Sequence, residues 1–131
     1  MKVFIVEDEA FLVLNLKRQL LAAGYEICGV ESTGERAIAR LLGADEADLV
    51  IMDIGLAGRM SGIDTARALA AEKTLPVIFM TGYDEAEIRE RAGDLAPAGF
   101  LAKPVGTDKL LACIDAVRRE RGIAAEKSIE R

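Results

Sequence analysis

Short apolar runs alternate with segments of helical periodicity along the whole chain. The runs hold several large apolar residues in succession without polar alternation, which is typical of strands buried on both faces. They predict strands at residues 3–6, 26–31, 48–53, 75–80 and 98–102. After each run, apolar residues recur at every third or fourth position, which is the spacing of an amphipathic helix. This pattern predicts helices at residues 10–23, 33–42, 63–72, 85–91 and 107–119.

The regular alternation of strand and helix predicts an α/β fold. Right-handed crossovers between parallel strands place helices on both faces of one sheet. Five strands and five helices suit a flavodoxin-like, doubly wound sheet in the order 2-1-3-4-5. No linker or repeat divides the sequence, so residues 1–121 are expected to form one domain, followed by a polar C-terminal tail at residues 122–131.

The composition limits the function classes that fit this chain. It has 131 residues, of which 51% are hydrophobic and 30% are charged, as in an ordinary folded domain. A net charge of -5 argues against direct binding to nucleic acid, which needs clustered basic residues. With neither a signal peptide nor an apolar run near 18 residues, we expect a cytoplasmic protein without a membrane partner. Cys28 and Cys113 are expected to be buried, reduced thiols.

Candidate chemistry gathers at the predicted strand ends. Glu7 and Asp8 follow the first strand, Asp53 ends the third, Thr81 follows the fourth and Lys103 follows the fifth. The sequence has no histidine, which leaves carboxylate, hydroxyl and lysine chemistry. Because parallel strands end at a common edge, we expect these side chains to converge there. Each residue taken singly has an ordinary alternative, such as a helix-entry charge, an N-cap or a surface lysine.

Three neighbouring carboxylates repel one another unless a cation joins them. Hard oxygen ligands that leave room for water suit Mg²⁺, and Mn²⁺ is the alternative metal. Acids, a metal, a hydroxyl group and an ammonium group together suit a transferring phosphoryl group. The sequence therefore predicts a phosphoryl-transfer site at this edge of the sheet.

Four motifs at the strand ends resemble the receiver domain of bacterial two-component response regulators. They are Val6-Glu-Asp8, Val50-Ile-Met-Asp53, Met80-Thr-Gly82 and Phe100-Leu-Ala-Lys-Pro104, and the resemblance covers about residues 2–120. The resemblance implies that Asp53 is the phosphoacceptor and that the protein is a stand-alone signalling domain, not an enzyme.

The resemblance also implies a role for each neighbour of Asp53. Glu7, Asp8 and the backbone carbonyl of Gly55 would bind the metal with Asp53. Thr81 would hydrogen-bond the phosphoryl group, and Lys103 would form an ion pair with it. The peptide bond between Lys103 and Pro104 would be cis. Lys103 is expected to matter more for signal transmission than for resting stability.

The chain also departs from the usual family pattern. Phe79-Met-Thr-Gly-Tyr83 resembles a subgroup with a Phe-Ala-Thr-Gly-Tyr signature, with Met80 in place of the alanine. Gly82 belongs to that motif, and Tyr83 would flank the approach of water together with Gly55. The 53–62 loop is one residue longer than usual and has Ala57 where a proline is common, which leaves its shape open. Phe100 stands at the position of the switch aromatic but lacks a phenolic hydroxyl.

The resemblance implies a histidine kinase or a histidine phosphotransfer protein as phosphodonor. The output would be a downstream protein that binds the fifth strand and the last two helices, and the sequence leaves open whether the chain forms a homodimer. Two other functions also fit parts of this pattern. One is a degenerate receiver that binds a partner without phosphorylation. The other is a phosphatase of the haloacid-dehalogenase type, which would need an Asp-x-Asp pair after the first strand, whereas Ile54-Gly55 follows Asp53.

Overall fold

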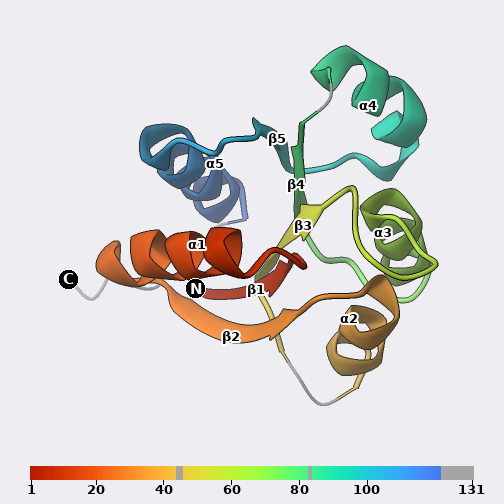
Figure 1. Cartoon of the computed structure of the whole chain (residues 1–131), viewed down its shortest axis with the longest axis horizontal. Helices are drawn as coiled ribbons and strands as arrows, with labels where there is room; N and C mark the ends of the chain where they lie inside the picture. Colours follow the sequence, from red (N-terminus) through yellow and green to blue (C-terminus); the bar gives the residue numbers. More distant parts are fainter. Residues whose placement is uncertain (44–45, 83, 122–131) are drawn as a thin grey trace.

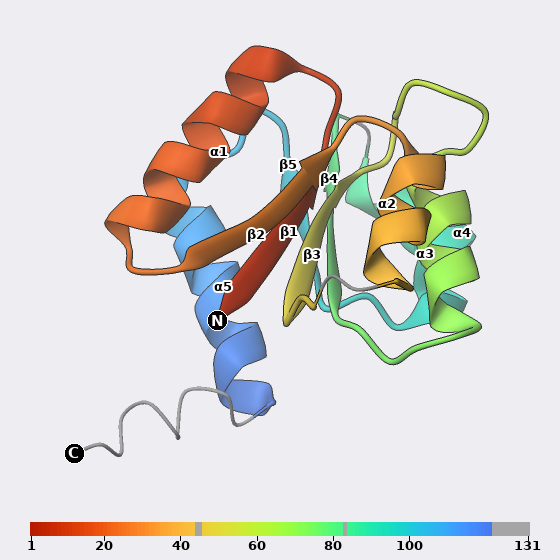
Figure 2. The same ribbon diagram turned by 90° about the horizontal axis from the view of Figure 1, so that it is seen from below.

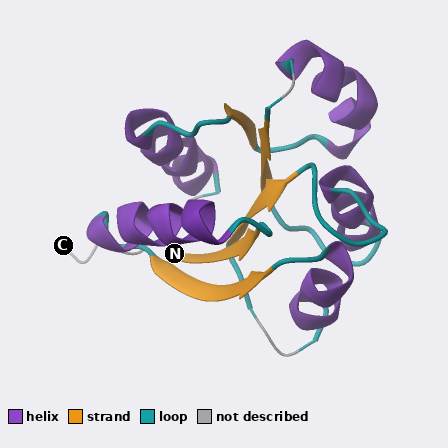
Figure 3. Cartoon of the chain, in the orientation of Figure 1, coloured by secondary structure: helices purple, strands orange, loops and turns teal. Residues whose placement is uncertain are grey.

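Five parallel strands form the central sheet in the described part of this computed structural model, which covers residues 1–43, 46–82 and 84–121. The strands are β1 (Lys2–Val6), β2 (Glu26–Glu31), β3 (Leu49–Asp53), β4 (Val77–Thr81) and β5 (Gly99–Ala102). They lie in the order β2-β1-β3-β4-β5, and each neighbouring pair is parallel (Figure 1 and Figure 3). The doubly wound order 2-1-3-4-5 is therefore confirmed.

Helices cover both faces of this sheet. They are α1 (Ala10–Ala22), α2 (Gly34–Leu41), α3 (Gly62–Ala70), α4 (Glu85–Ala92) and α5 (Thr107–Glu120), with a 3-10 turn η1 (Gly93–Leu95) after α4. α1 and α5 lie on one face, and α2, α3 and α4 lie on the other (Figure 2). Among the described residues, no helix is both long and apolar enough to cross a bilayer.

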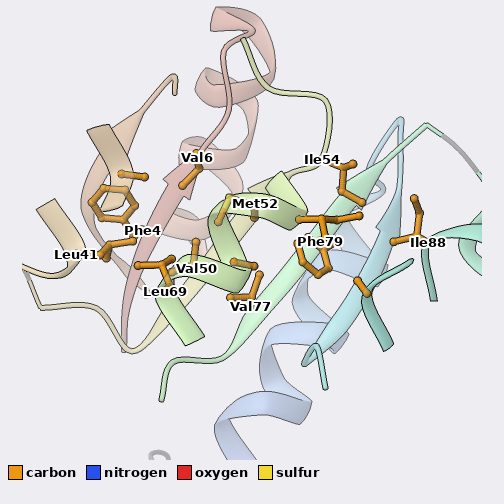
Figure 4. Packing of buried hydrophobic residues seen from close by; sticks show 14 residues of the cluster. Phe4, Val6, Leu41, Val50, Met52, Ile54, Leu69, Val77, Phe79 and Ile88 are labelled. Carbon is orange, nitrogen blue, oxygen red and sulfur yellow. The ribbon is translucent and has the colours of Figure 1, made fainter. Parts of the chain in front are cut away.

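Alternating residues along the strands pack into two separate hydrophobic cores, one on each face of the sheet. In β1, Val3 and Ile5 pack toward α1 and α5, whereas Phe4 and Val6 pack toward α2, α3 and α4. Figure 4 shows the second core, which continues through Phe79. All residues of β3 are buried, as expected for a central strand covered on both faces. Asp53 therefore stands at the carboxyl end of a strand that is packed on both faces.

Two local expectations were wrong. The first helix was predicted to include Ala23, but α1 ends at Ala22 and Ala23 is its exposed C-cap. Cys28 and Cys113 are half-buried, not buried. Cys28 lies on an edge strand where the pairing with β1 shifts register, and Cys113 lies at the margin of the α5 contact with β5.

Candidate functional site

Parallel pairing brings the predicted site residues to one edge of the sheet. Glu7 and Asp53 stand at the same level, because the residues that precede them in β1 and β3 are register partners. Asp53 itself pairs with Met80, the residue before Thr81. The backbone N–H of Lys103 donates to the carbonyl oxygen of Thr81 at 2.9 Å, which holds the end of β5 at this level too. The convergence predicted from the strand ends is present.

Lys103 joins the two buried carboxylates of this site. Its Nζ lies 2.9 Å from Asp53 Oδ1 and 3.1 Å from Glu7 Oε1. The side chains of Glu7 and Asp53 are only 1% and 6% exposed, whereas that of Lys103 is 27% exposed. The other Glu7 oxygen, Oε2, accepts a hydrogen bond from the N–H of Glu9 at 3.0 Å. A single ammonium group therefore compensates two carboxylates that have little access to water.

Burial and charge act in opposite directions on protonation here. Burial raises the pKa of Glu7, and the Asp53 carboxylate raises it further, while the Glu9 N–H and the Lys103 ammonium partly offset both effects. Burial alone would lower the pKa of Lys103, but hydrogen bonds and charge interactions with Asp53 and Glu7 outweigh it and raise that pKa. The lysine is thus held as a cation, and Glu7 is the acid whose charge is incompletely compensated.

Asp8 adds a third carboxylate to the cluster. One carboxylate oxygen from each of Glu7, Asp8 and Asp53 lies within 4.8 Å of the other two. Asp8 is exposed, so the cluster opens to solvent on its side. Three hard oxygen donors with one open side can hold a divalent cation that keeps several of its waters. The raised pKa of Glu7 fits this interpretation, because a cation among the acids would offset both the burial and the repulsion that raise it.

The loop after Asp53 returns to the end of β3, where its first and last residues lie close together. The N–H of Gly62 donates to the carbonyl oxygen of Ile54 at 2.8 Å. A Cβ at Gly62 would lie 2.1 Å from the carbonyl oxygen of Asp53, so this close approach requires glycine. Gly55 is exposed at the start of the loop, two residues after Asp53. The loop is therefore closed directly beside the acidic cluster.

The remaining predicted residues flank this cluster. Thr81 ends β4 and is 3% exposed, and Gly82 follows it in an exposed position. Tyr83 lies outside the described residues. The Lys103–Pro104 peptide bond is cis, as the resemblance implied.

Phe100 links the site to α4 through a contact that the sequence did not indicate. Its ring is half-buried, with its centroid 6.2 Å from that of Phe79. The guanidinium carbon of Arg89 lies 4.6 Å from the Phe100 ring centroid, and Arg89 also forms an ion pair with Glu85 at 2.7 Å. The spacing of Glu85 and Arg89 indicates their ion pair, but no local pattern shows which strand residue the arginine covers.

The match to a known family covers most of the chain. A family model described as the response regulator receiver domain matches residues 3–115. The chain therefore belongs to the receiver domain family of response regulators.

Two curated relatives come from Mycobacterium tuberculosis (strain ATCC 25618 / H37Rv). The transcriptional regulatory protein PdtaR is 36% identical over 125 residues, which cover 95% of this chain and 60% of that protein. The sensory transduction protein RegX3 is 38% identical over 121 residues, which cover 92% of this chain and 52% of that protein. The chain thus spans between half and two thirds of the length of these relatives.

Solved structures share the fold. The signal receiver domain of a modulated diguanylate cyclase from Desulfovibrio desulfuricans G20 is 36% identical, with a TM-score of 0.83 over 94% of this chain and 97% of that one. The N-terminal domain of a response regulator/sensory box/GGDEF 3-domain protein from Carboxydothermus hydrogenoformans is 30% identical, with a TM-score of 0.83 over 95% of this chain and 99% of that one. These similarities support the receiver fold along the chain.

Proposed function

We propose that this receiver domain accepts a phosphoryl group on Asp53 in two-component, histidine-to-aspartate signal transduction. The observation that carries the proposal is the buried Asp53 carboxylate, held by the Lys103 ammonium at 2.9 Å beside Glu7 and Asp8. The carboxylate stands at the carboxyl end of a central parallel strand, where ligands of open α/β sheets bind. The domain itself is a signalling unit and not an enzyme that turns over a separate substrate.

In the proposed reaction, an Asp53 carboxylate oxygen attacks the phosphorus of a phosphohistidine. The new O–P bond forms as the N–P bond breaks, and the electron pair of that bond returns to the donor imidazole. The Lys103 ammonium, already beside Asp53, neutralises charge on the transferring oxygens. The Thr81 hydroxyl at the end of β4 donates to the same group.

Mg²⁺, or Mn²⁺ in its place, is the proposed cation. Glu7, Asp8 and Asp53 would hold it, together with the backbone carbonyl of Gly55. This ligand set matches the preference of Mg²⁺ for a few carboxylates plus water and phosphate oxygens. When bound, the cation would offset the negative charge that builds up on the phosphoryl oxygens.

The exposed side of α1 is the proposed docking surface for the phosphodonor. Phe11, Leu14 and Leu21 are 83%, 49% and 56% exposed, and their spacing places them on one stripe of the helix. α1 begins two residues after Asp8, so the stripe starts at the rim of the acidic cluster. These 131 residues contain no histidine, so the proposed donor histidine lies outside them, on a histidine kinase or a histidine phosphotransfer protein. An apolar helical surface on that donor would bury the stripe.

The output surface is proposed to consist of α4, β5 and α5. Phosphorylation of Asp53 would draw Thr81 inward and let Phe100 turn into the space behind it. Because Phe100 contacts Arg89, this movement would change the surface of α4. A downstream protein, or a second copy of the chain, would bind the changed surface. Residues 1–121 are the proposed receiver unit, and the predicted polar tail at 122–131 lies outside the described residues.

Intact-mass analysis with acetyl phosphate over a Mg²⁺ titration tests the proposal. One phosphoryl group should add to the wild type and none to Asp53→Asn, while Asp108→Asn, a change at an exposed acid of α5, should behave like the wild type. Uptake by Asp53→Asn at the wild-type rate would move the acceptor elsewhere, with Asp8 the next candidate. Turnover of many phosphate esters would indicate a phosphatase, and no reaction at any Mg²⁺ concentration would indicate a phosphorylation-independent binding module.

A further inference from the structure

The loop beside the acidic cluster rests on the junction of β2 and α2. Ala57 forms an isolated parallel bridge with Thr33, the N-cap residue of α2. The Oε2 atom of Glu35, in the first turn of α2, accepts a hydrogen bond from the backbone N–H of Arg59 at 3.3 Å. Both contacts fall within four residues of Gly55. An element that contributes no residue to the acidic cluster therefore holds the middle of this loop.

Glu35 also lies close to the turn in the loop. Gly58 has a φ of +92°, and a Cβ built on it would lie 3.2 Å from Oε1 of Glu35. The two ends of the loop are tied together where the N–H of Gly62 donates to the carbonyl oxygen of Ile54 at 2.8 Å, and the capping box of Ser61 and Asp64 fixes the C-terminal end at the start of α3. With the ends held, the contacts from the β2–α2 junction decide the path of the stretch between them.

The β2–α2 junction also contacts the end of β1, which carries Glu7. The backbone N–H of Glu7 donates to the carbonyl oxygen of Glu31, the last residue of β2, at 3.0 Å. The carboxylate of Glu31 in turn pairs with Arg40 of α2 at 3.1 Å. The junction therefore contacts both the strand end that carries Glu7 and the loop that carries Gly55.

We propose that Glu35 is a positioning residue for the metal-binding loop. By accepting from Arg59, its carboxylate holds the loop conformation on which the role of Gly55 depends. The inference rests on the proposed function and adds to it a residue that is not a metal ligand. A loop backbone that is already held by such a contact loses less conformational entropy when a ligand fixes it.

Two variants of Glu35 separate its hydrogen bond from its charge. Glu35→Ala removes the acceptor, whereas Glu35→Gln keeps an acceptor oxygen and removes the charge. Asp108→Ala is the matched control, because Asp108 is also an exposed acid at the second position of its helix. The readouts are the Mg²⁺ dissociation constant from calorimetry and the amide exchange of residues 54–61 without metal.

We expect Glu35→Ala to raise the Mg²⁺ dissociation constant about threefold to tenfold. Loss of a group that supports a metal ligand usually weakens metal binding about tenfold to hundredfold. The effect here should be at or below the low end of that range, because the hydrogen bond from Arg59 to Glu35 is long and exposed. Exchange in residues 54–61 should speed up in the same variant. Glu35→Gln and Asp108→Ala should both stay within about twofold of the wild type. A Glu35→Ala protein with wild-type affinity and exchange, or a Glu35→Gln protein as impaired as Glu35→Ala, would overturn the inference. If the wild type takes up no phosphoryl group, the proposed function fails, and exchange at Arg59 in the metal-free variants still decides the role of Glu35.

Discussion

Lys103→Met should destabilise the metal-free protein, because Lys103 holds two buried carboxylates together. The sequence alone suggested a small cost, but Nζ contacts both Asp53 and Glu7 in the resting structure. Methionine keeps much of the stem and removes the ammonium group. Removing one partner of a fully buried ion pair costs about 3 to 5 kcal/mol. Since the Lys103 side chain is 27% exposed, solvent reduces this cost, and we expect about 2 kcal/mol, or about 6 to 8 °C in Tm, at neutral pH.

The loss should depend on pH, because Glu7 can take up a proton. Burial already raises the pKa of Glu7, and loss of the Lys103 ammonium would raise it further. An acid with a raised folded-state pKa binds more protons when folded. Its contribution to stability is therefore fully present below the unfolded pKa and is lost as pH rises through the folded pKa. The deficit of Lys103→Met should be largest above neutral pH and should shrink toward about pH 5.

Thermal melts in chelator and in saturating Mg²⁺, at about pH 5 and about pH 7.5, measure both effects. Mg²⁺ should also reduce the deficit, because a bound cation supplies the missing positive charge. Lys109→Met is the control, since Lys109 is an exposed lysine of α5. If the two variants melt within about 2 °C of each other in chelator at the higher pH, the ion pair does not stabilise the fold. A deficit that is unchanged at the lower pH would refute the role of Glu7.

Three further changes test other parts of the structure. Asp8→Asn should raise Tm in chelator by about 1 to 3 °C, because it removes one of three carboxylates that repel one another, and it should weaken Mg²⁺ binding. A lower Tm in chelator would show that this repulsion does not destabilise the metal-free protein. Gly62→Ala should cost about 3 kcal/mol, because its Cβ would lie 2.1 Å from a backbone oxygen of β3; urea unfolding beside Gly93→Ala, where no atom lies within 4 Å, provides the comparison. Arg89→Ala should speed amide exchange in α4 and β5 without changing phosphoryl uptake, because the guanidinium group stacks on Phe100; unchanged exchange would show that this contact does not restrain the ring.

Local patterns in the sequence determined the elements and their order. Unbroken apolar runs marked the covered strands, and helical spacing marked the buried face of α5 at Leu110, Ile114 and Val117. The position of the acids and of Lys103 after separate strands was enough to predict their convergence. These predictions succeeded because side-chain periodicity is local and parallel strands end at a common edge.

Contacts between distant side chains were decided only by the tertiary structure. The sequence did not indicate that Glu35 would accept from Arg59, that Arg89 would stack on Phe100, or that Phe11 would remain exposed. Each outcome depends on the path of a loop, or on the relative placement of elements far apart in the chain. Periodicity shows which face of a helix is apolar, but packing in three dimensions decides how much of that face another element covers and which side chain it meets.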